Sequence, residues 1–89
     1  MFQNVTAVVN TTGISEDLIQ TYIRLGWIVT VSKEGSLFLS FQQQYRLRFV
    51  HHLSTKMGLN EHEVATILRH ENPPYSIASV PSILAEHCR

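Results

Sequence analysis

The chain has 89 residues and a formal net charge of zero, with 44% hydrophobic and 16% charged residues. A chain of this length forms one domain around a single modest core. Seven Lys and Arg residues balance seven Asp and Glu residues, so the basic excess typical of a DNA-binding domain is missing. The single cysteine, Cys88, cannot form an internal disulfide. We therefore expect a cytoplasmic protein, with neither a signal peptide nor a membrane span.

Residues 4–11 are predicted to form a short first helix. Val5, Val8 and Val9 are spaced to share one helical face, and Gly13 follows as a stop. Their β-branched side chains would also suit a short strand, so that alternative stays open at this point.

The second element is predicted as an amphipathic helix between Ser15 and Gly26. Ser15 is a favourable N-cap, and two carboxylates follow in the first turn, where the helix dipole stabilises anions. We expect Trp27 to fold back onto the helix end. The buried side is predicted to hold Leu18, Ile19, Tyr22, Ile23 and Leu25, and the exposed side Asp17, Gln20, Thr21 and Arg24. The tight turn at residues 12–14 gives the pair helix-turn-helix spacing.

A β-hairpin and a long helix are predicted next. Residues 28–31 favour a strand, residues 33–36 a turn, and residues 37–39 the returning strand. Ser40 and Gln43 have the spacing of a capping box at the start of a helix that Gly58 ends. Its apolar face is predicted from Tyr45, Phe49, Val50, Leu53 and Met57. Arg46 projects into that face, so its head must either find a partner or snorkel to water.

A last main helix is predicted to begin after Asn60, with Glu63 three residues on, and to end near His70. Its inward side chains are predicted to be Val64, Ile67 and Leu68. Pro73 and Pro74 then interrupt the chain. We predict a domain of residues 1–72 and a short C-terminal tail of residues 73–89, with one or two helical turns after Ser79. Whether the tail packs on the domain, joins a dimer or stays loose is left open.

The order helix, helix, hairpin, helix, helix predicts a mainly α, winged helix-turn-helix fold in which the hairpin is the wing. Two stretches resemble the MerR family: Thr12-Gly13-Ile14-Ser15 through Leu25-Gly26-Trp27-Ile28, and Leu47-Arg48-Phe49-Val50-His51-His52-Leu53 with Met57-Gly58-Leu59-Asn60. The resemblance runs from about residue 5 to residue 68. Its short motifs are only moderately specific, and their order and spacing carry more weight.

Departures from the MerR pattern affect the positions that would meet DNA. DNA-binding members typically carry an arginine where this chain has Gln20, an aromatic residue where it has Thr21, and an arginine in the returning wing strand where it has Leu37. Glu16 and Asp17 add negative charge that would repel phosphate. The pattern is more similar to the CbpM-like branch of chaperone modulators. That resemblance implies binding to the J-domain of a DnaJ-like co-chaperone.

The sequence offers two candidate binding surfaces. The first is the exposed side of the second helix, with partner-binding residues Asp17, Gln20, Thr21 and Arg24. The second is a candidate basic patch made of Arg46, Arg48, His52 and Lys56. An ordinary solvated helix face is the favoured explanation of these residues, because the cations are few. Trp27 and Phe38 are expected to fill the core, although either would also suit an interface anchor.

We expect no enzymatic activity, no cofactor and no metal site. The histidines and Cys88 match no usual zinc-ligand spacing, and no acid–base pair or phosphate-binding glycine loop occurs. The main hypothesis is a non-enzymatic bacterial regulator that binds a J-domain protein. A MerR-like transcriptional regulator or excisionase-like factor that binds DNA is the alternative, and a homodimerisation module of a larger complex is a further one.

Overall fold

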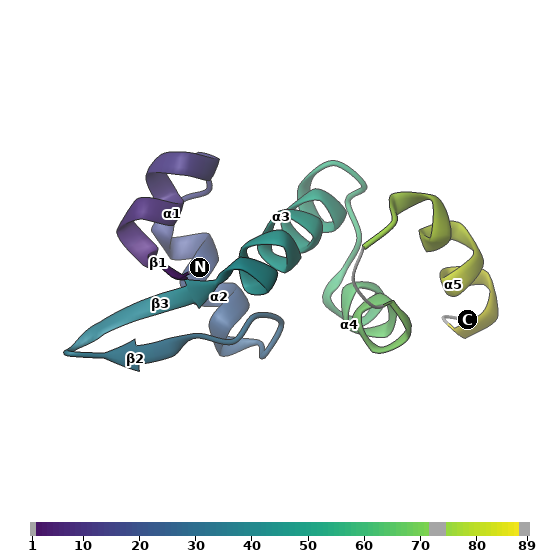
Figure 1. Ribbon diagram of the computed structural model, residues 1–89. Coiled ribbons are helices and arrows are strands. Elements are labelled where there is room, and N and C mark those ends of the chain that lie inside the picture. Colours follow the sequence, from purple (N-terminus) through teal and green to yellow (C-terminus); the bar gives the residue numbers. More distant parts are fainter. Residues whose placement is uncertain (1, 72–74, 88–89) are drawn as a thin grey trace. The chain divides into compact units, whose positions relative to one another are not determined.

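The computed structural model describes residues 2–71 and 75–87 (Figure 1). The described residues are mainly helical, which confirms the predicted class, and five α-helices accompany a small antiparallel sheet. The elements are, in order, β1 (Phe2–Asn4), α1 (Val5–Thr12), α2 (Glu16–Arg24), β2 (Val31–Lys33), β3 (Ser36–Ser40), α3 (Phe41–Thr55), α4 (Glu61–His70), the 3-10 helix η1 (Ile77–Ser79) and α5 (Val80–His87).

The chain divides into two compact units, Met1–Arg48 and Phe49–Arg89, and the division falls inside α3. The first unit holds the sheet, α1 and α2, and the second holds α4, η1 and α5. None of the helices in the described part of the chain has both the length and the apolar character needed to cross a membrane.

The sheet has one strand more than the sequence predicted. β1 pairs antiparallel with β3, so the strand order is β1-β3-β2 and β3 is central. β1 leads directly into α1, because Asn4 ends the strand and its side chain accepts the N–H of Ala7 at 2.7 Å as the helix N-cap. The helical prediction for residues 4–11 is therefore confirmed, and the strand lies just before it.

The hairpin is confirmed, but its first strand begins later than predicted. Lys33 pairs with Ser36, so Glu34 and Gly35 form a two-residue turn, with φ of 52° and 78°. Positive φ at both positions is the type I′ geometry that matches strand twist. The predicted strand at residues 28–31 is wrong except at its last residue. Ile28 is 1% exposed in the core, and the Val29 N–H donates to the Gln43 side chain instead of a strand.

α2 has the predicted caps at both ends. The Ser15 hydroxyl accepts the N–H of Leu18 at 3.2 Å. At the other end the Trp27 N–H donates to the Tyr22 carbonyl and the Gly26 N–H to the Ile23 carbonyl, both at 3.0 Å, which is a Schellman motif. The Trp27 ring stacks on Tyr22 with centroids 5.7 Å apart and is only 8% exposed. Trp27 therefore belongs to the core, as predicted.

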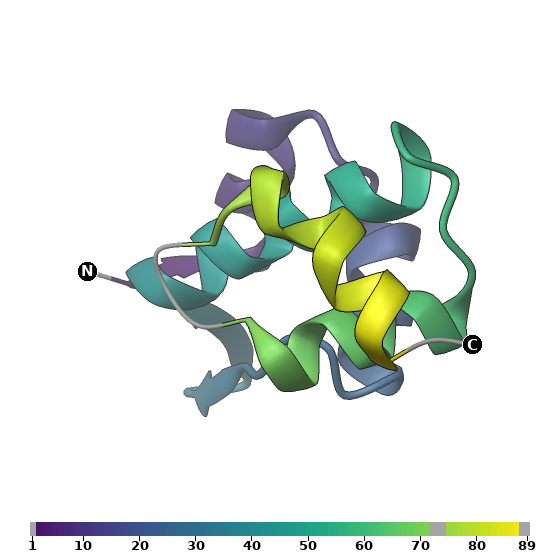
Figure 2. The same cartoon turned by 90° about the vertical axis from the view of Figure 1, so that its right-hand side faces the viewer.

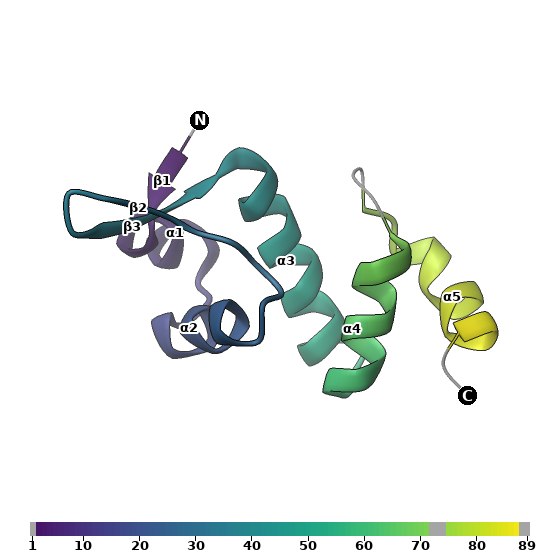
Figure 3. The same cartoon turned by 90° about the horizontal axis from the view of Figure 1, so that it is seen from below.

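The core of the first unit lies on one face of the sheet. Side chains alternate along β3, so Leu39 is fully buried on the side of α1, which contacts this strand. Figure 3 shows α2 on one side of the hairpin. Buried apolar side chains of this unit include Val8, Ile14, Ile19, Tyr22, Trp27, Ile28 and Leu39. Leu18 and Leu25, predicted for the buried side of α2, are each 37% exposed, so that part of the prediction is wrong.

α3 is confirmed as a long helix with an altered cap and an altered apolar face. The Ser40 hydroxyl accepts the N–H of Gln43 at 3.2 Å, which is the first half of the predicted capping box. The Gln43 side chain accepts the N–H of Val29 and does not supply the second half. Tyr45 is 54% exposed, whereas Leu47 is fully buried. At 100° per residue the buried arc centres near Val50, which places Leu47 rather than Tyr45 inside it.

Within the second unit, α4 has the predicted capping box: the Asn60 side chain accepts the Glu63 N–H, and the Glu63 carboxylate accepts the Asn60 N–H. Val64 and Ile67 are fully buried as predicted, while Leu68 is only partly so. The tail forms η1 and α5, and Figure 2 shows α5 crossing α4, which it contacts. Of the alternatives left open for the tail, packing on the fold is thus observed for α5. Pro73, Pro74 and Cys88 lie outside the described residues.

Candidate functional site

The four predicted partner-binding residues lie together on one exposed side of α2, and we call them the α2 face: Asp17, Gln20, Thr21 and Arg24. Their spacing of three and four residues places them side by side on the helix surface. The Thr21 hydroxyl donates to the Asp17 carbonyl at 2.9 Å, and the Arg24 guanidinium reaches the Thr21 hydroxyl at 3.5 Å. Asp17, Gln20 and Arg24 are exposed and Thr21 is half-buried. The α2 face is therefore accessible in this structure, and hydrogen bonds within the helix hold Thr21 and Arg24 on it.

An apolar strip borders the α2 face. Leu18 and Leu25 are seven residues apart, so they lie above one another on the same side of the helix, next to Thr21. Each leaves about a third of its side chain in water, at 37% exposure. Exposed leucines contribute to affinity by burial against another apolar surface, whereas a phosphate backbone offers them no such surface.

A hollow of about 230 Å³ lies on the other border of the α2 face, where Gln20 is part of its wall. The remaining wall comes from the start of α1, the first turn of α2 and the start of β3. Its polar residues are Asn4, Thr6, Glu16, Gln20 and Ser36, and its apolar residues are Val5 and Leu37. Glu16 is the one charged residue among these. Sequence reasoning missed this hollow because three segments far apart in the chain form it.

The charged residues of α2 lie at the ends where the helix dipole stabilises them. Glu16 and Asp17 stand in the first turn and Arg24 in the last, so each charge lies at the helix end that stabilises it. Both carboxylates lie at the N-terminal end of α2 and the guanidinium lies at the other end. The helix surface is therefore acidic at its N-terminal end, beside the hollow. A surface of this kind attracts a basic partner and disfavours phosphate.

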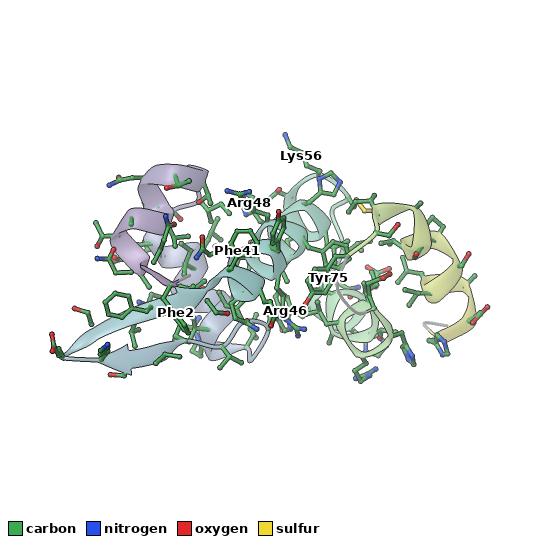
Figure 4. All side chains as sticks on the ribbon, in the orientation of Figure 1. Phe2, Phe41, Arg46, Arg48, Lys56 and Tyr75 are labelled. Atoms are coloured by element: carbon green, nitrogen blue, oxygen red, sulfur yellow. The ribbon has the colours of Figure 1, made fainter. Side chains whose placement is uncertain are left out.

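The candidate basic patch does not form one surface. Arg46 is half-buried, and its Nε donates to the carbonyl of Trp27. Of the two outcomes expected for its head, a partner or water, the structure therefore shows a partner. Figure 4 places Arg46 and Arg48 on opposite sides of α3, as expected for positions two apart. Arg48 and Lys56 are exposed and His52 is half-buried.

His51, beside this predicted patch, is a titratable group with a perturbed pKa. Its burial, and to a smaller degree the nearby Lys56 ammonium, lowers the pKa of His51 below 6.5. His51 therefore contributes little positive charge at neutral pH.

A metal centre finds no support in the geometry of the described residues. No group of three or more His, Cys, Asp or Glu side chains gathers there. The rings of His70 and His87 do meet, stacked with centroids 3.7 Å apart, and the carboxylate of Glu86 lies 3.5 Å from His87 Nε2. Cys88 lies outside the described residues, so the prediction about that thiol stays a prediction.

Comparison with protein-family models, with curated proteins and with solved structures finds no match to this chain. The function is therefore inferred from the chain's own residues and from the resemblance of its sequence to the CbpM-like pattern.

Proposed function

We propose that the chain is a non-enzymatic winged helix-turn-helix module that binds a protein through the α2 face, and that this protein is the J-domain of a DnaJ-like co-chaperone in the bacterial cytoplasm. In this proposal the β2–β3 hairpin is the wing, and α1 and α2 are the helix-turn-helix. Binding restrains the co-chaperone, as the CbpM-like sequence pattern implies.

The observation that carries the proposal is the chemistry of the exposed side of α2. In a helix-turn-helix protein this side usually meets DNA and supplies side chains that contact bases and phosphates. Here it offers Asp17, Glu16 and two exposed leucines, with Arg24 as the single cation of the helix. Apolar contact flanked by charge is typical of a protein interface.

The hollow beside α2 supports a basic partner. A lysine or arginine of the partner would lay its aliphatic stem against Val5 and Leu37 and direct its charged head toward Glu16. A basic helix, such as a J-domain carries, would meet both the hollow and the acidic start of α2. Electrostatic attraction of this kind mainly accelerates association and selects the partner.

The DNA-binding alternative draws on the same fold and on Arg48, which is exposed on α3. Its weakness is the small number of available cations, because Arg46 is engaged by Trp27 and the hairpin tip carries only Lys33 next to Glu34. A surface with fewer cations to pair with phosphates binds DNA more weakly and with a smaller salt dependence.

The test is a calorimetric and NMR titration of the chain with a J-domain protein from the same organism, with random duplex DNA in parallel at two salt concentrations. We expect saturable J-domain binding with shifts at Asp17, Gln20 and Arg24. Asp17→Lys should weaken it by about tenfold, because it places a cation opposite a basic partner.

The matched control is Glu61→Lys, which makes the same charge change in the first turn of α4. It carries the same cost from the helix dipole but leaves the α2 face unchanged. Equal weakening by both variants, or binding to DNA alone with a steep salt dependence, would overturn the proposal.

A further inference from the structure

The sheet of the first unit has an apolar outer face that the α2 proposal does not use. The register places Phe38 opposite Val31 on one side and opposite Asn4 on the other, and Phe2 opposite Ser40. Since alternate residues of a strand share a face, Phe38, Val31 and Phe2 lie on the face opposite to buried Leu39. These three residues form what we call the outer sheet face. Phe2 is 56% exposed and Val31 48% exposed.

The outer sheet face is hollowed and bordered by two opposite charges. A depression of about 500 Å³ is lined by Phe2, Val31 and Phe38, with Lys33 and Glu34 at the hairpin tip. Phe41, the first residue of α3, follows Ser40, the register partner of Phe2, and so lies near Phe2 without lining the hollow. Tyr45 packs edge-on against Phe41 with centroids 4.9 Å apart, and each ring is 54% exposed. Figure 4 labels Phe2 and Phe41 at this end of the sheet.

We infer that the outer sheet face binds a second copy of this chain in a two-fold, weak dimer. A two-fold interface joins the same surface of each copy, so the surface must be complementary to itself. An apolar centre with one lysine and one glutamate at its border meets this condition, because Lys33 of each copy can oppose Glu34 of the other. The zero net charge of the chain removes the long-range repulsion that would keep two copies apart.

The available apolar area limits the size of this interface. A fully buried aromatic side chain removes about 150–250 Å² from water, so the exposed parts of Phe2, Phe41 and Tyr45 offer about 80–140 Å² each. With Val31 the apolar contribution is roughly 300–500 Å² per copy, below the roughly 800 Å² per partner of a standard interface. We therefore expect a weak dimer in rapid exchange.

A nucleic acid is a poorer occupant of this face. Aromatic side chains on a sheet stack well with unpaired bases, but such platforms combine stacking with a positively charged groove for the backbone. Lys33 is the one cation lining the hollow, and Glu34 opposes it. The inference does not depend on J-domain binding, since it concerns different residues of the first unit.

The experiment is sedimentation velocity of the full chain from about 20 µM to 1 mM, with thermal unfolding of every variant to confirm folding. We expect a concentration-dependent shift from monomer to dimer, and at least a tenfold weakening by Val31→Lys on the exposed edge strand. The control is Ile77→Lys, which places the same charge at an apolar side chain, 40% exposed, in the second unit. A monomer at 1 mM, a dimer that survives Val31→Lys, or equal weakening by the control would overturn the inference.

A charge exchange tests the two-fold arrangement separately. Lys33→Glu alone places like charges at the border of both copies and should weaken the dimer several-fold. Adding Glu34→Lys restores one charge of each sign and should recover most of the association. Failure of the double variant to recover would exclude a self-complementary interface. Random single-stranded RNA that binds the wild type but not Phe2→Ala would reassign the face to nucleic acid.

Discussion

Replacement of Gly26 by alanine tests the structure of the α2 C-terminus, which fixes both the α2 face and Trp27. Gly26 has φ of 79°, and a Cβ added there would have nothing within 4 Å. The cost of alanine is therefore conformational and not steric. An L-residue in the left-handed region costs roughly 1–2 kcal/mol. Alanine also restricts the unfolded chain, which returns about 0.4–1 kcal/mol.

We expect Gly26→Ala to lower the free energy of unfolding by about 0.8 kcal/mol, with an upper bound of about 1.6 kcal/mol. For a domain of this size the central value corresponds to a fall in Tm of about 3–6 °C. Urea unfolding followed by the fluorescence of Trp27, the only tryptophan in the sequence, measures this change in the first unit. Gly26→Asn should cost less, since asparagine tolerates positive φ. An alanine variant more stable than the wild type, or an asparagine variant that is less stable than the alanine variant, would refute the conformational explanation.

Three further predictions concern stability. Leu39 is 0% exposed in the centre of the sheet, so Leu39→Ala should lower the free energy of unfolding, measured in urea, by about 2–5 kcal/mol. A loss below about 1 kcal/mol would mean that the core is not built on β3. Asn60→Ala should lower the free energy of unfolding by about 1 kcal/mol, because it removes the N-cap of α4. The same loss in a chain that already carries Glu63→Ala would argue against a reciprocal capping box. Because burial lowers the pKa of His51, the unfolded chain binds its proton more readily. Stability should fall as pH drops below 6.5 toward the pKa in the folded protein, and His51→Gln should reduce that dependence in parallel melts across about pH 5 to 8.

The sequence by itself determined the features that depend on near neighbours. The N-caps Ser15 and Asn60, the helix end at Gly26 and the turn of the hairpin involve residues at most five positions apart. Their geometry is set by local hydrogen bonds and by backbone preference, which a short window of sequence contains. The exposed positions of the α2 face were predicted from helical periodicity for the same reason.

Only the tertiary structure decided the features that join distant segments. β1 was missed because a three-residue strand has no signal of its own, and its identity comes from pairing with β3, which begins 32 residues after β1 ends. Gln43 left its predicted capping role because the Val29 N–H needed an acceptor. Periodicity marks which side of a helix is apolar but not how much of it neighbouring elements cover, so Leu18 and Leu25 remained partly exposed. The hollow beside α2 and the outer sheet face arise in the same way, from side chains that packing brings together after the local elements have formed.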